Sequence, residues 1–121
     1  MFHTILIVDD SPQIRRSMRS YIDACTDWRV CGEAENGQQG VEKAQQLHPD
    51  LIVLDLSMPV MNGLQAASVL RRLMPAVPLI IFSDYSSVLS DAEVRSAGIS
   101  ALVSKTENLS VLLGKASALL A

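Results

Sequence analysis

Residues 51–63 read LIVLDLSMPVMNG, and this stretch decides the fold. Its first four residues are apolar, and the length and composition of that run predict a strand buried on both faces. The run ends on a carboxylate, Asp55, and the turn-forming pairs Met-Pro and Asn-Gly follow closely. An unpaired carboxylate in apolar surroundings either costs several kcal/mol or takes up a proton, so Asp55 requires partners from elsewhere in the chain.

Strand and helix patterns alternate along the rest of the chain. Short apolar runs, mostly β-branched, predict strands over 4–8, 28–34, 51–54, 78–82 and 101–103. Apolar residues spaced three and four apart predict helices over 14–25, about 37–47, 64–73 and 88–97, and 109–120. Three strands have almost no polar residue on either face, which indicates a parallel sheet covered by helices on both sides. We therefore predict an α/β fold, a doubly wound sheet of five parallel strands with five helices.

The composition fits one domain that spans residues 1–121. Of these residues, 49% are hydrophobic and 19% are charged, which is enough apolar material for a core. The net charge of −3 and the pI near 5.2 argue against nucleic-acid binding by this chain. Its apolar runs are far shorter than the ~20 residues of a membrane span, and Cys25 and Cys31 are expected to stay reduced. We therefore expect a cytoplasmic protein with no membrane contact.

Polar side chains follow four of the five predicted strands. The first strand is followed by Asp9 and Asp10, the third by Asp55, the fourth by Ser83, and the fifth by Lys105. Because the carboxyl ends of parallel strands meet at one edge of a sheet, we expect these groups to lie together there. Each group alone is explained as a helix cap or a loop opener, but four strand ends with such groups favour a shared site.

A cluster of carboxylates needs a cation. Two carboxylates about 5 Å apart repel by roughly 3 kcal/mol at an effective dielectric constant of ~20. The predicted ligands are oxygens, with no cysteine or histidine beside them, which favours Mg²⁺ or Mn²⁺ over zinc. Such a cation beside the ammonium of Lys105 and the hydroxyl of Ser83 indicates a phosphoryl site. Asp55 would attack phosphorus there and form an aspartyl phosphate.

Several segments carry a resemblance to a known family. The receiver domain of bacterial two-component response regulators is similar over essentially the whole chain, through ILIVDDSPQIRR, PDLIVLDLSMPVMNG, VPLIIFSDYS and AGISALVSK. The segment WRVCGEAENGQQGVEKA further resembles the subfamily whose receivers precede a helix-turn-helix DNA-binding domain. The resemblance implies a flavodoxin-like sheet with strand order 2-1-3-4-5, in which the first and third strands are neighbours.

The resemblance also implies a metal-dependent reaction at the acidic residues. Asp55 would accept a phosphoryl group from a histidine kinase in a transfer that depends on Mg²⁺. Asp9 and Asp10 would form an acidic pair that holds this cation with Asp55, and Asp10 would be its more direct ligand. The carbonyl oxygen of Ser57 would complete the metal shell.

A conformational switch and two kinds of partner are implied as well. Ser83 would follow the phosphoryl group as the switch hydroxyl, and Lys105 would bridge to it. The chain would catalyse only its own phosphorylation and dephosphorylation, so it would not be an enzyme in the wider sense. Phosphorylation would favour a homodimer and control an output, namely transcription through a DNA-binding domain outside this chain. The basic residues Arg15, Arg16 and Arg19 are either a solvated helix face or the docking surface for the histidine-containing donor.

Three positions depart from the family pattern. Leu102 stands where an aromatic residue is common, three residues before Lys105, which leaves no aromatic gate at that position. Asp84 stands directly after the predicted switch hydroxyl, where a small residue is usual. Thr106 follows Lys105 where many relatives have proline.

Proteins with other functions share this architecture, and the residues of this chain distinguish among them. A pseudo-receiver, which is an interaction module that is never phosphorylated, would not need the intact set of polar residues at the strand ends. A phosphohydrolase with an aspartate nucleophile typically has a second aspartate two residues on, where this chain has Ser57. A flavin-binding protein would have a phosphate loop rich in Ser, Thr and Gly after the first strand, and DDSPQ is not such a loop.

Overall fold

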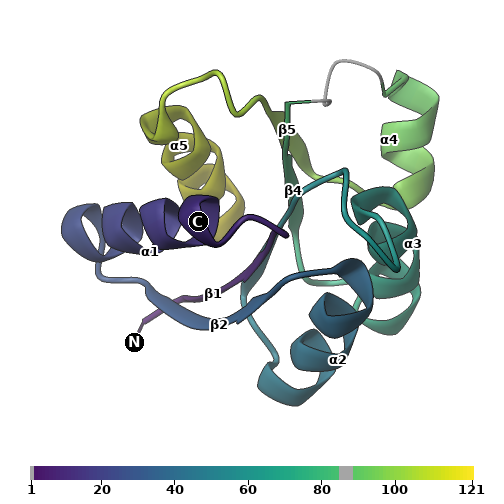
Figure 1. Cartoon of the computed structure of the whole chain (residues 1–121), viewed down its shortest axis with the longest axis horizontal. Helices are drawn as coiled ribbons and strands as arrows, with labels where there is room; N and C mark the ends of the chain where they lie inside the picture. Colours follow the sequence, from purple (N-terminus) through teal and green to yellow (C-terminus); the bar gives the residue numbers. More distant parts are fainter. Residues whose placement is uncertain (1, 85–88) are drawn as a thin grey trace.

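The computed structural model describes residues 2–84 and 89–121 and consists of a five-stranded sheet between two layers of helices (Figure 1). The strands are β1 (Thr4–Val8), β2 (Arg29–Ala34), β3 (Leu51–Leu54), β4 (Leu79–Phe82) and β5 (Ala101–Val103). The helices are α1 (Pro12–Cys25), α2 (Gly37–Leu47), α3 (Gly63–Leu73), α4 (Asp91–Ala97) and α5 (Leu109–Leu120). The strand order is β2-β1-β3-β4-β5 and every neighbouring pair is parallel, so the predicted doubly wound, flavodoxin-like fold is confirmed.

Alternate residues of each strand pack against opposite helix layers. Leu6 and Val8 belong to a buried cluster with α2, α3 and α4, whereas Ile5 and Ile7 pack with α1 and α5. This alternation follows from the two-residue repeat of a strand. Figure 1 shows α1 and α5 on one side of the sheet and the other three helices on the opposite side. The central strands are therefore buried on both faces, and they form a rigid support for the residues that follow them.

The helix and strand bounds agree with the predicted ones to within two residues, except at α4. The predicted start of this helix, residue 88, lies outside the described residues, and α4 begins at Asp91. The hydroxyl oxygen of Ser90 accepts a hydrogen bond from the Glu93 amide, and the Glu93 carboxylate accepts one from the Ser90 amide, both at 3.1 Å. This reciprocal pair of bonds is a capping box, which fixes the first turn of the helix after Ser90.

The described residues include both cysteines and the five helices given above. Cys25 is exposed, Cys31 is half-buried, and both are free thiols. The longest of the described helices, α1, has 14 residues, whereas a membrane-spanning helix needs about 20. Within residues 2–84 and 89–121, no helix has the length and apolar character to cross a membrane.

Candidate functional site

The carboxyl ends of β1 and β3 place two buried carboxylates side by side. The Asp55 amide donates to the carbonyl oxygen of Val8 at 2.8 Å, and the Asp9 amide donates to that of Ala34 at 3.0 Å. Both aspartates therefore extend the backbone hydrogen bonding of the sheet by one residue beyond the strands. Their exposed fractions are only 1% for Asp9 and 5% for Asp55. The strands fix these two residues, because each has a backbone partner in the next strand.

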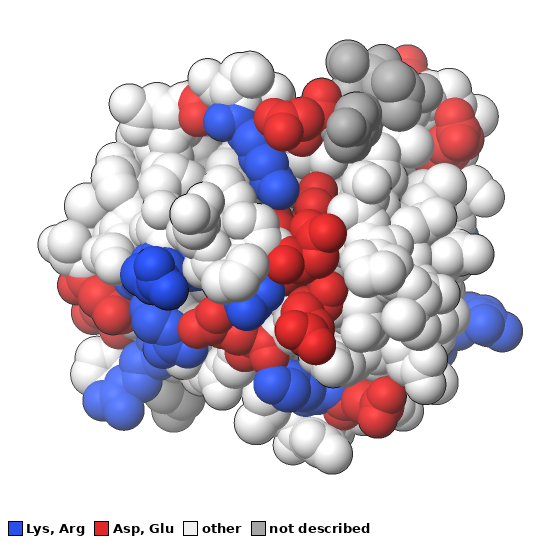
Figure 2. All heavy atoms as spheres, viewed as in Figure 1, with Lys and Arg blue, Asp and Glu red and all other residues white. Residues whose placement is uncertain are grey.

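A third carboxylate joins this pair. Asp9, Asp10 and Asp55 each offer one carboxylate oxygen, and these atoms all lie within 4.8 Å of one another. Asp10 is exposed, so the cluster is reached from solvent. Figure 2 shows acidic side chains gathered in a stripe down the middle of the face that includes the site. The structure thus brings together the three carboxylates that follow the first and third strands, as predicted.

Lys105 lies against the buried pair. Its Nζ atom is 2.8 Å from Oδ2 of Asp9 and 3.4 Å from Oδ2 of Asp55, and its side chain is 13% exposed. The backbone brings it there, because the Lys105 amide donates to the carbonyl oxygen of Ser83 at 3.3 Å. The contact joins the end of β5 to the ends of β1 and β3 across the sheet edge.

Burial and charge act in opposite directions on these groups. Burial is the largest influence on the pKa of Asp9 and raises it, and the charge of Asp55 adds to this; Lys105 and the Ser11 amide only partly offset the rise. Burial acts to lower the pKa of Lys105, but Asp9 and Asp55 outweigh it, so the pKa of Lys105 is raised. Lys105 therefore stays protonated at neutral pH. A single ammonium leaves a net negative charge on three carboxylates, which favours the binding of a cation.

The donor atoms of the cluster fit a hard divalent cation. Oδ2 of Asp9 is fully buried and has an ion pair with the ammonium of Lys105 but no hydrogen-bond partner among the described residues. This oxygen therefore keeps capacity for another ligand. All three side chains of the cluster supply carboxylate oxygens, which Mg²⁺ and Mn²⁺ prefer. Ser57 lies two residues after Asp55 with an exposed side chain, and the metal contact of its carbonyl stays a prediction.

Ser83 occupies the same sheet edge between β4 and β5. It is fully buried, and its amide donates to the carbonyl oxygen of Val103 at 3.1 Å. Leu102, half-buried in β5, packs against the cluster formed with α2, α3 and α4. Nζ of Lys115 on α5 donates to the Leu102 carbonyl oxygen at 3.0 Å. Asp84, which follows Ser83, is exposed.

Comparison with known proteins shows the family to which this chain belongs. The family model described as the response regulator receiver domain matches residues 5–117. This chain belongs to the response regulator receiver domain family. The family predicted from the sequence motifs is therefore confirmed. Among its relatives, the nitrate/nitrite response regulator protein NarL of Escherichia coli (strain K12) is 46% identical over 80 residues. These residues cover 66% of this chain but only 37% of NarL, so the receiver domain matches about a third of that relative.

Two solved structures resemble the receiver domain closely. A two-component response regulator of the LuxR family from Aurantimonas sp. SI85-9A1 has a TM-score of 0.90 at 26% identity, covering 99% of this chain and 86% of that one. The response regulator protein TrrA from Thermotoga maritima, in complex with Mg(2+)-BeF, has a TM-score of 0.88 at 29% identity. That match covers 98% of this chain and 100% of TrrA.

Between β3 and the first residue of α3, the structure shows three features that were not predicted from the sequence. A Cβ atom on Gly63 would lie 2.0 Å from the carbonyl oxygen of Asp55, so only glycine fits there. The Asn-Gly pair, interpreted as a turn, is in fact the start of α3, where the Asn62 side chain accepts a hydrogen bond from the Gln65 amide at 2.9 Å. Val60 has a φ of 68°, in the left-handed region that a β-branched residue rarely adopts. The sequence signals for these three features were limited to the turn-forming residues around them.

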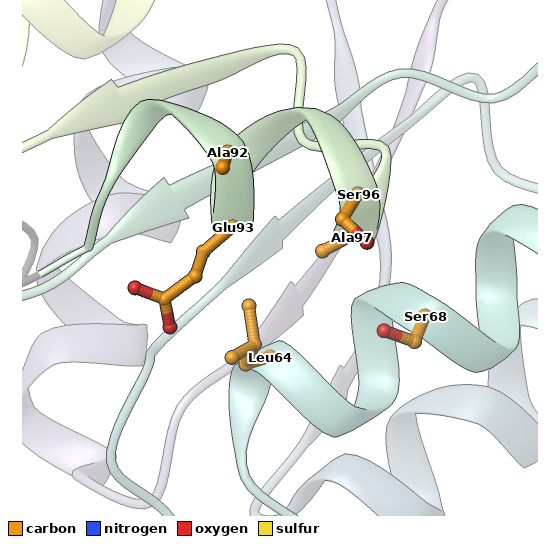
Figure 3. A pocket seen from close by; sticks show the side chains of 6 residues that line it. All are labelled: Leu64, Ser68, Ala92, Glu93, Ser96 and Ala97. Atoms are coloured by element: carbon orange, nitrogen blue, oxygen red, sulfur yellow. The ribbon is translucent and has the colours of Figure 1, made fainter.

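A separate hollow of about 320 Å³ lies between α3 and α4 (Figure 3). Leu64 and Ser68 of α3 line one side, and α4 contributes Ala92, Glu93, Ser96 and Ala97. Among these described lining residues the only charged side chain is Glu93, which already caps α4 through the Ser90 amide. The predicted site residues lie instead at the sheet edge, where the carboxylates and Lys105 meet.

Proposed function

We propose that this receiver domain accepts a phosphoryl group on Asp55 and signals through the change that follows. The observation that carries the proposal is the position of Asp55, buried at the end of a central strand within reach of two carboxylates and one ammonium. The strand supplies rigidity, and the neighbours supply the charges that phosphoryl transfer requires. Asp9, Asp10 and the Ser57 carbonyl are the proposed metal ligands beside Asp55.

The two oxygens of Asp55 have different surroundings, which suits a nucleophile. Oδ1 accepts a hydrogen bond from the Leu56 amide at 2.8 Å, and this contact fixes the plane of the carboxylate. An Asp55 oxygen would attack phosphorus, forming an O–P bond while the P–N bond to the donor imidazole breaks. The electron pair of the broken bond goes to the imidazole nitrogen, and the product is an aspartyl phosphate. Bound Mg²⁺ would neutralise the phosphoryl oxygens during this transfer.

Lys105 and Ser83 would then contact the phosphoryl group on Asp55. The Lys105 ammonium already lies at the Asp55 carboxylate, so a phosphoryl oxygen on Asp55 would be within its range. The carbonyl oxygen of Ser83 accepts a hydrogen bond from the Lys105 amide. A movement of the Ser83 hydroxyl toward the phosphoryl group would therefore shift the ends of β4 and β5 together. The resulting population shift is the signal in this account.

The partners follow from the family and from this chemistry. The donor is a phosphohistidine of a histidine kinase, and the output is transcription through a DNA-binding domain outside this chain. NarL and the LuxR-family structure are response regulators, which supports that kind of output. The chain would catalyse only its own phosphorylation and dephosphorylation, and phosphorylation would favour a homodimer.

Labelling with a small acyl phosphate tests the proposal. Intact-mass spectrometry should show one added phosphoryl group on the wild-type chain with Mg²⁺, and none after chelation of the metal. Asp55→Asn should abolish the adduct, whereas Asp23→Asn, at an exposed position on α1, should keep it. An adduct that persists in Asp55→Asn would reject Asp55 as the acceptor. No adduct on the wild-type chain with acyl phosphate or a phosphorylated kinase would favour the pseudo-receiver.

A further inference from the structure

Arg15 on α1 connects β2 to the acidic end of β1. Its Nε atom lies 3.0 Å from Oε1 of Glu33 on β2, and its Nη1 donates to the carbonyl oxygen of Asp9 at 2.6 Å. The side chain is 16% exposed, so these contacts form in a largely dehydrated setting. One planar guanidinium therefore binds a carboxylate and a backbone carbonyl at the same time, which its fixed fork of donors allows.

The carbonyl of Asp9 matters because it belongs to the peptide that connects Asp9 to Asp10. The other polar groups of Asp9 also have partners. Its amide donates to the Ala34 carbonyl oxygen, Oδ1 accepts from the amide of Ser11, the N-cap of α1, at 2.8 Å, and Oδ2 pairs with the Lys105 ammonium. Asp10 is exposed, and its carboxylate still lies within the cluster. A fixed Asp9 carbonyl prevents rotation of this peptide plane, and so it sets the direction in which the Asp10 side chain leaves the backbone.

We propose that Arg15 is a positioning residue that orients Asp10 toward the divalent cation. Arg15 contacts no reacting atom and acts only through the Asp9 carbonyl. The inference rests on the proposed function, because it assumes that the three carboxylates hold Mg²⁺. Groups that orient metal ligands from outside the metal shell commonly change the metal affinity when they are removed.

Arg19 offers a matched comparison on the same helix. Its Nε atom lies 2.8 Å from Oε2 of Glu33, so it pairs with the same carboxylate as Arg15. It lies four residues further along α1, which is about 6 Å of helix. Of these two arginines, Arg15 is the one whose guanidinium also binds the Asp9 carbonyl. Replacing either residue by glutamine removes one positive charge and one ion pair with Glu33, but only Arg15→Gln removes the contact with the site.

Loss of the Arg15 charge and loss of the Asp10 orientation have opposite effects on Mg²⁺ affinity. Measurements at low and high salt distinguish the two effects. Removing a positive charge beside three carboxylates favours binding of a cation, and this effect weakens as the ionic strength rises. Losing the correct orientation of Asp10 disfavours binding at every ionic strength. A weaker Mg²⁺ affinity in Arg15→Gln that persists at high salt would therefore report orientation.

The experiment measures Mg²⁺ binding to the full chain by titration calorimetry and the rate of phosphorylation by acyl phosphate as a function of Mg²⁺. Arg15→Gln should raise the Mg²⁺ dissociation constant about tenfold. The Mg²⁺ concentration for half-maximal rate should rise equally, while the rate at saturating Mg²⁺ stays near the wild-type value. Arg19→Gln should bind Mg²⁺ nearly as the wild type does. Arg15→Lys should be intermediate, because an ammonium cannot reproduce the two-sided contact of the guanidinium.

The outcomes separate the inference from the function on which it rests. Equal Mg²⁺ affinities for Arg15→Gln and the wild type, or equal losses in Arg15→Gln and Arg19→Gln, would overturn the inference while the wild-type chain is still phosphorylated. A wild-type chain that neither binds Mg²⁺ nor takes a phosphoryl group would overturn the proposed function and the inference together. Circular dichroism checks that each variant is folded. If Arg15→Gln does not fold, a wild-type Mg²⁺ affinity in Arg15→Lys overturns the inference.

Discussion

At the scale of single residues, Asp9 shows how tightly the site is constrained. Each of its four polar groups has a contact, with Ala34, Ser11, Arg15 and Lys105. The sequence was sufficient to bring Asp9 to the sheet edge, because every residue that follows a parallel strand arrives there. It was not sufficient for the Arg15 contact, because the reach of a long side chain depends on rotamers that no periodic pattern encodes.

Val60 is a residue at which the backbone conformation opposes the side chain. Its φ of 68° is unfavourable for a β-branched residue, and such strain costs about 1–3 kcal/mol. Its side chain is 76% exposed, so little apolar burial is lost when it is removed. Val60→Gly should therefore raise the free energy of unfolding by about 1 kcal/mol, after allowance for the greater freedom of glycine in the unfolded chain. Urea denaturation followed by circular dichroism measures this change.

A second valine variant supplies the control for this strain. Val111 is 36% exposed and lies in α5, where the backbone has ordinary helical geometry. Val111→Gly should lower the free energy of unfolding, because glycine is unfavourable inside a helix. A decrease in both variants would mean that side-chain contacts of Val60, and not its backbone conformation, dominate at that position.

At the scale of elements, α1 is tied to β2 through a shared carboxylate. Glu33 accepts hydrogen bonds from Arg15 and Arg19, and Lys43 on α2 donates to its carbonyl oxygen. Two of the three arginines that were candidates for a docking surface are therefore engaged within the fold, and Arg16 is exposed. Apolar periodicity predicted α1, α2, α3 and α5 closely. It failed at the start of α4, because Leu89 continued the apolar pattern while the capping box of Ser90 determined where the helix begins.

The tie between α1 and β2 should depend on pH. Burial acts to raise the pKa of Glu33, but the hydrogen bonds and charges of Arg19 and Arg15 outweigh it and hold the pKa below its usual range. A carboxylate with a lowered folded pKa stabilises the fold above its unfolded pKa, and this contribution is lost as the pH falls through the folded pKa. Glu33→Gln should therefore cost about 1 kcal/mol of stability at neutral pH and progressively less in acid.

Urea denaturation of both proteins over a series of pH values measures this difference. Glu42→Gln, at an exposed position on α2, is the matched control and should leave the stability unchanged at every pH. A constant difference between wild type and Glu33→Gln from neutral to acidic pH would show that the ion pairs with Arg15 and Arg19 do not stabilise the fold.

At the scale of the whole molecule, the sheet and the loops at its edge are determined by different kinds of interaction. The strands and the two helix layers follow from hydrophobic patterning, which is why the sequence predicted them. The convergence of Asp9, Asp10, Asp55 and Lys105 was predicted as well, because these residues follow parallel strands. The loop after β3 depends on a glycine packed against a carbonyl and on one strained residue, and these are close-range contacts without a periodic signature. In the proposed function, phosphorylation would act where the sheet and the loops meet, since the strands would hold the acceptor Asp55 and the loops would respond.

The most direct test of this account is a crystal structure of the full chain with Mg²⁺ and beryllofluoride, a mimic of the phosphoryl group. The account predicts beryllium bonded to a carboxylate oxygen of Asp55, with the cation held by Asp9, Asp10 and the carbonyl of Ser57. It also predicts that Lys105 has moved from Asp9 to a fluorine atom and that the Ser83 hydroxyl contacts another. A mimic bound away from Asp55, or a cation bound outside the three carboxylates, would contradict the account.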